Sequence, residues 1–223
     1  MNENWGWAST YYPNRTAAWA MRLRDDAHPV TSPFPQDEMA PILDDPNVEA
    51  IIVNGHTNIS HPKVISFPLG IPPSSLGLIA HNRAVLEDPS SFAKTSVLFH
   101  ASSTFGIRPT LTECILKRLH KPGQPSLVDV VPSGTKVSRG DFFYRLTRAR
   151  LVLCLPGVGA ETYRMWESVF AGAVAIVERG FGLERTVNRL PVLFVDDFAD
   201  LSEQLLMQAY IQVRGCPPLR IYP

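Results

Sequence analysis

Short apolar runs alternate with amphipathic segments over most of the chain, from about residue 94 onward. Continuous apolar runs predict buried strands over residues 96–100, 127–131, 151–155, 174–177 and 192–195. Apolar residues that recur every three or four positions predict helices over residues 108–120, after residue 138, and over 161–171 and 198–213. Apolar strands separated by amphipathic helices are typical of a parallel sheet covered on both faces. The pattern therefore predicts an α/β fold, a Rossmann-like parallel sheet flanked by helices, over residues 94–197.

Two helix starts carry local signals of their own. Ser138 and Asp141 have the spacing of a capping box, and they precede a helix with Phe142 and Leu146 on one face. Asp197 directly precedes the apolar stripe of the last predicted helix. We interpret it as a helix N-cap rather than as part of a metal-binding acidic pair.

The part of the chain before residue 94 lacks this regular alternation. Residues 1–40 are rich in aromatic and turn-forming residues, while the runs 50–53 and 64–69 predict two short buried strands. Residues 72–89 have the proline and serine content of a connecting segment. The chain thus divides into a partly irregular region over 1–75, a connector over 76–93, the sheet domain over 94–197, and a C-terminal helix and tail over 198–223.

Charge and composition exclude several functional classes. Lysine plus arginine and aspartate plus glutamate both number 21, so the formal net charge is zero, which argues against a nucleic-acid partner. No apolar run is long enough for a membrane span, and the first residues do not resemble a signal peptide. The three cysteines, Cys114, Cys154 and Cys216, are scattered without metal-ligand spacing. We therefore expect no metal site and no membrane segment in this chain.

The candidate chemistry lies where the predicted strand 151–155 ends. The strand runs into a turn with Gly157 and Gly159, and a helix begins directly after it. Glycines let backbone N–H groups approach a ligand, and a helix start offers further unpaired N–H groups to an anion. A dinucleotide fingerprint is excluded because Thr162 replaces its third glycine. The turn therefore predicts a seat for a phosphate.

The helix after this turn places charged residues on one face. At helical spacing, one arc faces the sheet and contains Tyr163, Trp166, Val169 and Phe170. Glu161, Arg164 and Glu167 occupy the opposite arc. The Arg164 guanidinium could hold a diphosphate, and Glu167 could accept hydrogen bonds from a ribose. The spacing fits equally a solvated helix face with ordinary ion pairs between neighbouring turns.

A longer stretch around this turn resembles a known family. Residues 141–177, DFFYRLTRARLVLCLPGVGAETYRMWESVFAGAVAIV, are similar to the signature of exostosin-type glycosyltransferases. That signature has a strand, a glycine turn, an acidic residue, Tyr-Arg-x-Trp-Glu, a small-residue turn and a second strand. Residues 61–70, 96–108 and 190–197 resemble further segments of the family, so the resemblance covers roughly residues 48–201.

This resemblance implies a two-lobed GT-B fold whose C-terminal lobe binds a nucleotide sugar without a metal or other cofactor. Arg164 would then meet the diphosphate and Glu167 the ribose or base, with Arg108, Glu161 and the Gly157–Gly159 turn nearby. The implied activity is transfer of a sugar from a nucleotide-diphosphate sugar, a UDP-sugar by preference, to a glycan or glycoprotein acceptor. The resemblance assigns no catalytic residue to this chain.

The region before the connector is short for such an enzyme. Only about 70 residues precede it, fewer than a complete acceptor-side lobe needs. We therefore expect residues 1–75 to be the remnant of a truncated N-terminal lobe. The alternative function is a non-catalytic nucleotide-sugar-binding or interaction module, a fragment derived from such an enzyme. The family setting implies protein glycosylation in the Golgi lumen, although the absence of a predicted anchor leaves a cytoplasmic location open.

Overall fold

The computed structural model describes residues 36–54, 61–87, 94–101, 108–120, 128–156, 161–179, 187 and 189–214. The elements in chain order are α2 (Gln36–Asp44), β1 (Ile51–Asn54), β2 (Val64–Phe67), a 3₁₀ helix η2 (Pro73–Ser75), α3 (Gly77–Glu87), β3 (Ser96–Ala101), α4 (Arg108–Leu119), β4 (Val128–Val131), α5 (Arg139–Arg148), β5 (Ala149–Leu153), α6 (Tyr163–Phe170), β6 (Val174–Glu178), β7 (Val192–Val195), a 3₁₀ helix η4 (Phe198–Asp200) and α8 (Glu203–Arg214). The strands and helices predicted after residue 94 are therefore confirmed, with ends that differ by a few residues, except that the single helix expected over residues 198–213 is divided into η4 and α8. Within the ranges just given, no helix has the length and apolar character that crossing a membrane requires.

A five-stranded, fully parallel sheet forms the centre of the molecule, which confirms the predicted Rossmann-like α/β fold. Its strand order is β4-β3-β5-β6-β7, so the chain first adds β4 on one side of β3 and then crosses to place β5 on the other. The register pairs Leu98 with both Val128 and Leu151, in the two strands next to β3. Numbered in chain order within this sheet, the strands lie in the order 2-1-3-4-5, which is one of the common doubly wound arrangements. In it the direction of winding reverses between the first and the third strand. Here the reversal lies between β3 and β5.

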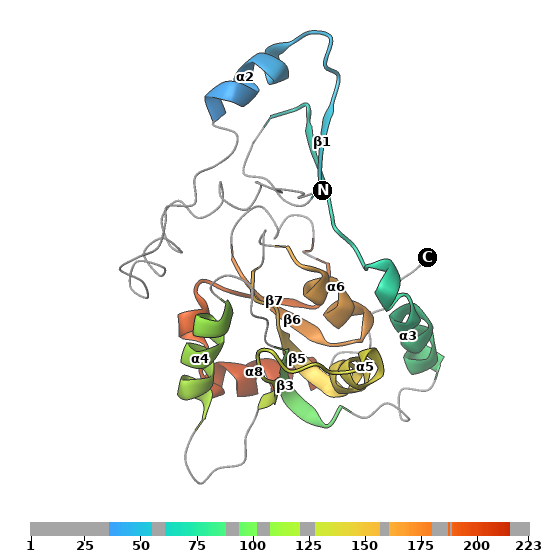
Figure 1. The fold of residues 1–223 in the computed structure, drawn as a ribbon, viewed down its shortest axis with the longest axis vertical. Helices are drawn as coiled ribbons and strands as arrows, with labels where there is room; N and C mark the ends of the chain where they lie inside the picture. The colour runs from blue at the N-terminus through green and yellow to red at the C-terminus, as the bar shows by residue number, and fades with distance from the viewer. Residues whose placement is uncertain are drawn as a thin grey trace.

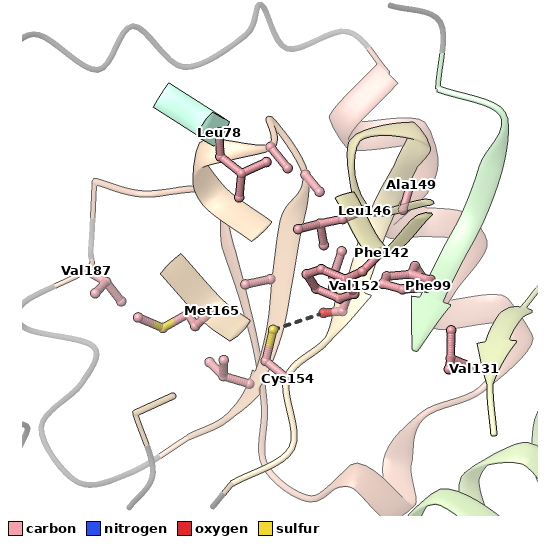
Figure 2. Packing of buried hydrophobic residues seen from close by; sticks show 14 residues of the cluster. Leu78, Phe99, Val131, Phe142, Leu146, Ala149, Val152, Cys154, Met165 and Val187 are labelled. Carbon is pink, nitrogen blue, oxygen red and sulfur yellow. Dashed lines mark hydrogen bonds between the residues drawn. The ribbon is translucent and has the colours of Figure 1, made fainter. Parts of the chain in front are cut away.

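Helices cover both faces of this sheet, and each face has its own apolar core. Helices α4 and α8 lie on one side, and α3, α5 and α6 on the other (Figure 1). Because successive side chains of a strand point to opposite faces, β5 contributes to both cores. Leu151 and Leu153 pack with α4 and α8, whereas Val152 and the following Cys154 pack with α5 and α6. Figure 2 shows Val152 and Cys154 within the second cluster, beside Met165 of α6.

The predicted helix caps form as expected. The hydroxyl of Ser138 accepts a hydrogen bond from the backbone N–H of Asp141 at 3.0 Å, and Phe142 and Leu146 are buried. Asp197 caps η4 by accepting from the N–H of Ala199 at 2.7 Å. Its interpretation as a cap is therefore confirmed. These caps fix where the chain enters each helix.

Two helices were not predicted from the sequence. Helix α3 occupies the predicted connector, and its Leu78 is buried in the core between α5 and α6. Helix α2 lies where we expected largely irregular structure. The prolines and serines ahead of both helices suggested loops, and this outweighed the apolar positions of α3.

The expectation that β1 and β2 are buried strands is wrong. They pair with each other in a separate two-stranded parallel sheet, with Ile52 opposite Ile65. Ile52 is 71% exposed, and Ile65 and Phe67 are exposed as well. An apolar run predicts a strand, but its burial needs a second layer. Among the described residues, no such layer covers this face.

Helix α6 ends in a turn that a buried lysine stabilises. Gly172 adopts a left-handed conformation (φ 69°), and the N–H groups of Gly172 and Ala173 donate to the carbonyls of Val169 and Ser168. The Lys94 ammonium donates to the carbonyl of Ala171 at 2.7 Å, at the negative end of the helix dipole. Burial lowers the pKa of Lys94 to about 7, and the charge of Arg150 contributes.

Lys94 should make the stability of the protein depend on alkaline pH. Below pH 7 the lysine is charged in both states, so the folded state carries the full cost of burying that charge. Between pH 7 and 10.5 the unfolded state binds the extra proton, so stability rises with pH. Relative to Lys94→Met, we expect the free energy of unfolding of the wild type to rise by about 3 kcal/mol between pH 6.5 and 9.5. Urea unfolding of both proteins at both pH values measures this. A constant difference between them would contradict it.

Candidate functional site

Three arginines begin helices at the same edge of the sheet. In a parallel sheet, each helix starts beyond the carboxyl end of the strand that precedes it, so these starts gather at one edge. Arg108 is the first residue of α4 and Arg139 the first of α5, whereas Arg164 lies in the first turn of α6. α4 follows β3 and α6 follows β5, on opposite faces of the sheet. The edge between these two strands is the candidate functional site.

The Arg164 guanidinium lies between α5 and α6. Its Cζ is 4.1 Å from the centre of the Phe142 ring, and its Nε is 3.8 Å from Oε2 of Glu167. The side chain is only 28% exposed, and its buried Nη1 has no hydrogen-bond partner among the described residues. Burial lowers the pKa of Arg164, the Glu167 carboxylate opposes this shift, and the charges of Arg108 and Arg139 add to it. A buried N–H without an acceptor is costly, which marks this atom as one that a ligand oxygen would satisfy.

Glu167 joins three elements through one buried carboxylate. Its Oε1 accepts from the Ser75 hydroxyl at 2.5 Å and from Nη2 of Arg139 at 3.0 Å. Its Oε2 faces Arg164, and the residue is 4% exposed. A buried carboxylate needs such charged and polar partners, because burying it without them would cost several kcal/mol. The predicted ribose contact of Glu167 remains a prediction, since the structure gives both oxygens partners within the protein.

Glu161, just before α6 begins, also joins distant parts of the chain through its carboxylate. Its Oε1 accepts from the backbone N–H of Leu69 at 2.9 Å and from the indole N–H of Trp166. Glu161 is buried, and its contact with Leu69, like that of Glu167 with Ser75, joins residues 92 positions apart. The two glutamates therefore hold the segment from Leu69 to Ser75 against α6.

The predicted orientation of α6 is only partly correct. Tyr163, which we expected to face the sheet, is 50% exposed, and Met165 and Ser168 are buried there with Val169. Glu167 lies away from the sheet but is buried. A helical wheel distinguishes the sheet side from the other side, but it does not reveal a second neighbour. Here η2 and α3 cover the face that the pattern assigned to solvent.

Arg108 reaches across to the end of β5. Its Nε donates to the carbonyl of Pro156 at 2.8 Å, and its Nη2 to that of Leu155 at 3.2 Å. These bonds satisfy carbonyls that follow the strand, directly ahead of the predicted glycine turn. Arg108 therefore fixes the carbonyls of Leu155 and Pro156 from the face of the sheet opposite α6. Gly157 and Gly159 themselves lie outside the described residues, so their predicted role is untested.

Two further side chains near the arginines, those of His100 and Cys154, remain uncharged near neutral pH. Burial lowers the pKa of His100 to about 4, and the positive charges of Arg164 and Arg108 lower it as well. The His100 ring shares a 2.9 Å hydrogen bond with the Thr112 hydroxyl. Cys154 is buried, and burial raises the pKa of its thiol to about 12, so this thiol stays protonated near neutral pH. The local charge therefore comes from the arginines and Glu167.

Sequence reasoning missed Arg139 and Ser75. Arg139 follows a capping serine, and an arginine in a first turn opposes the helix dipole. This unfavourable placement could have indicated that Arg139 binds an acidic group or a ligand. Ser75 gave no signal, because its partner Glu167 is 92 positions away. In the described part of the chain, no three His, Cys, Asp or Glu residues lie close enough to hold a metal ion. That no metal is required stays a prediction.

Comparison with known proteins adds no assignment: no family model matches this chain, and no curated protein does.

The Glu167 carboxylate should be one of the most important polar groups for stability. Its removal takes away the counter-charge that both Arg139 and Arg164 approach. We expect Glu167→Ala to lower the free energy of unfolding by about 3 kcal/mol. The matched control is Glu113→Ala, which removes an exposed helical carboxylate paired with Lys117 and should change the free energy of unfolding little, because water screens this pair. Urea unfolding measures both. Equal losses in the two variants would contradict the role of Glu167.

Proposed function

We propose that the carboxyl edge of this sheet binds the diphosphate of a nucleotide sugar, and that the chain is the donor-binding part of a GT-B glycosyltransferase of exostosin type. The observation that carries the proposal is the Arg164 guanidinium. It lies in the first turn of α6, beside the end of β5, and its buried Nη1 has no partner among the described residues.

The strand order supports this location. In doubly wound sheets, ligands bind beyond the carboxyl ends of the strands where the winding reverses, because the loops there separate to opposite faces. In this sheet the reversal lies between β3 and β5. Arg108 and Arg164 begin the two helices that follow these strands. The cations therefore lie where the fold by itself favours a ligand.

The charge balance supports an anionic ligand. Arg164 and Arg139 both face Glu167, so two positive groups share one carboxylate. A guanidinium presents its N–H donors in a planar fork that matches phosphate oxygens. A diphosphate would supply the missing negative charge and an acceptor for Nη1 of Arg164.

In the proposed reaction, an acceptor hydroxyl attacks the anomeric carbon of the donor sugar. The bond from that carbon to the diphosphate oxygen breaks and the diphosphate leaves with the electron pair. The proton of the hydroxyl passes to a base, for which the resemblance assigns no residue of this chain. Arg164 stabilises the charge that develops on the leaving diphosphate, as a metal ion would elsewhere. The acceptor is a glycan or glycoprotein, as the family resemblance implies, and a Golgi setting is part of the same proposal.

Removing Arg164 should abolish most of the affinity for the leaving nucleotide. We expect Arg164→Gln to weaken the binding of UDP by well over tenfold, because a charge-assisted, forked contact with phosphate is lost. Isothermal titration calorimetry at fixed ionic strength measures the affinity. Arg148→Gln is the matched control, since Arg148 ends α5 at the other edge of the sheet and contacts Thr95. Equal UDP affinity in the Arg164 variant and the wild type would exclude Arg164 from the site.

Turnover distinguishes an enzyme from a binding module. If the chain is catalytic by itself, the purified protein should release UDP from a UDP-sugar, and Arg164→Gln should slow that release strongly. Mass spectrometry of the nucleotide products measures it. A chain that binds UDP in an Arg164-dependent way but never releases it from any UDP-sugar is the non-catalytic module.

A further inference from the structure

Arg139 is built into the same cluster as Arg164 but comes from a different helix. Its Nη2 donates to Glu167 and to the hydroxyls of Ser74 and Ser75, and its Nε donates to the carbonyl of Ser74 at 3.3 Å. All of these contacts are made by Nε and Nη2, which form one side of the guanidinium. The other amino group, Nη1, makes no hydrogen bond within the described part of the chain, and the side chain is 47% exposed. Arg139 is therefore held firmly and still presents two N–H donors to solvent.

The positions of the two arginines are related through two shared neighbours. Arg139 approaches Oε1 of Glu167 at 3.0 Å, and Arg164 approaches Oε2 at 3.8 Å. Both guanidinium carbons also lie over the Phe142 ring, at 5.7 Å and 4.1 Å from its centre. One carboxylate and one ring thus hold two cations side by side at a single edge of the sheet. Each cation has one amino group that finds no acceptor among the residues that the structure describes.

This arrangement holds like charges together, which is costly without compensation. Arg164 is largely buried, and within the described part of the chain both arginines pair with the same carboxylate, that of Glu167. Close like charges repel by an amount that the low dielectric of a partly buried site increases. A fold that keeps two such groups adjacent, each with an amino group that makes no hydrogen bond to the described residues, is suited to a ligand with more than one anionic group.

We propose that Arg139 is a second anion-binding residue of this site, and that Arg139 and Arg164 together hold two linked phosphate groups. The inference rests on the proposed nucleotide-diphosphate site and goes further, because it assigns the second phosphate to a helix outside the predicted motif. Ser75 and Glu167 are positioning residues that orient Arg139. The site thus selects a diphosphate over a monophosphate.

The test compares ligands with one and two phosphate groups. Isothermal titration calorimetry at fixed ionic strength would use inorganic pyrophosphate, UDP and UMP on the wild type, Arg139→Gln, Arg139→Lys and the Arg148→Gln control. We expect Arg139→Gln to lose at least tenfold in affinity for pyrophosphate and UDP but under threefold for UMP, which Arg164 holds alone. Arg139→Lys keeps the charge without the fork, so its losses should be intermediate. Arg148→Gln should bind like the wild type.

A purely structural role of Arg139 would give another pattern. If Arg139→Gln weakens UDP and UMP equally, or leaves pyrophosphate binding unchanged, the inference is overturned. Should Arg139→Gln fail to fold, Arg139→Lys decides by the same comparison of UDP with UMP.

The same measurements separate this inference from the proposed function. If UDP binding depends on Arg164 but not on Arg139, the nucleotide site stands and the second phosphate contact is wrong. If pyrophosphate binding depends on Arg139 but no uridine nucleotide binds, the diphosphate site stands and the proposed function fails. A wild type that binds neither pyrophosphate nor UDP overturns both.

Discussion

The buried carboxylate of Glu167 is the interaction on which the edge of the sheet depends. The carboxylate accepts hydrogen bonds from Ser75 of η2 and from Arg139 of α5, and it lies beside Arg164 of its own helix. Without a counter-charge, neither arginine could remain next to the other in a partly buried place. The carboxylate therefore does more than satisfy one ion pair. It determines where two cations lie relative to the ends of β3 and β5.

Glu161 and Glu167 also connect two parts of the chain that are distant in sequence. Each binds a residue 92 positions earlier, at Leu69 and at Ser75, so the segment that enters α3 is fixed at two points, one just before α6 and one within it. Leu78 then anchors α3 in the apolar core on the same face of the sheet. The hydrogen bonds to Leu69 and Ser75 determine the position of this segment, and the burial of Leu78 stabilises it. A ligand at the arginines would thus touch a network that extends into the connector.

The fold after residue 94 could be predicted almost entirely from the sequence, because each element there has a strong local pattern. Strand β5 is an uninterrupted apolar run, and α5 combines a capping serine with an amphipathic face. Where local patterns were weak or ambiguous, prediction failed. Helix α3 follows a stretch of prolines and serines that is typical of a loop, and the apolar runs of β1 and β2 formed strands without being buried. Burial depends on what lies across from a strand, which its own residues do not encode.

The sequence by itself determined the strands, the helices, the parallel sheet and the position of Arg164 in the first turn of α6, since all follow from short-range spacing and from the rules of βα winding. Only the tertiary structure decided what surrounds Arg164. It brought in Arg139 from α5, buried Glu167 against Ser75, and directed Arg108 to the carbonyls at the end of β5. The reason is physical. A side chain's pairing depends on the charges and donors that packing brings within a few ångströms, and those residues come from helices and loops far away along the chain.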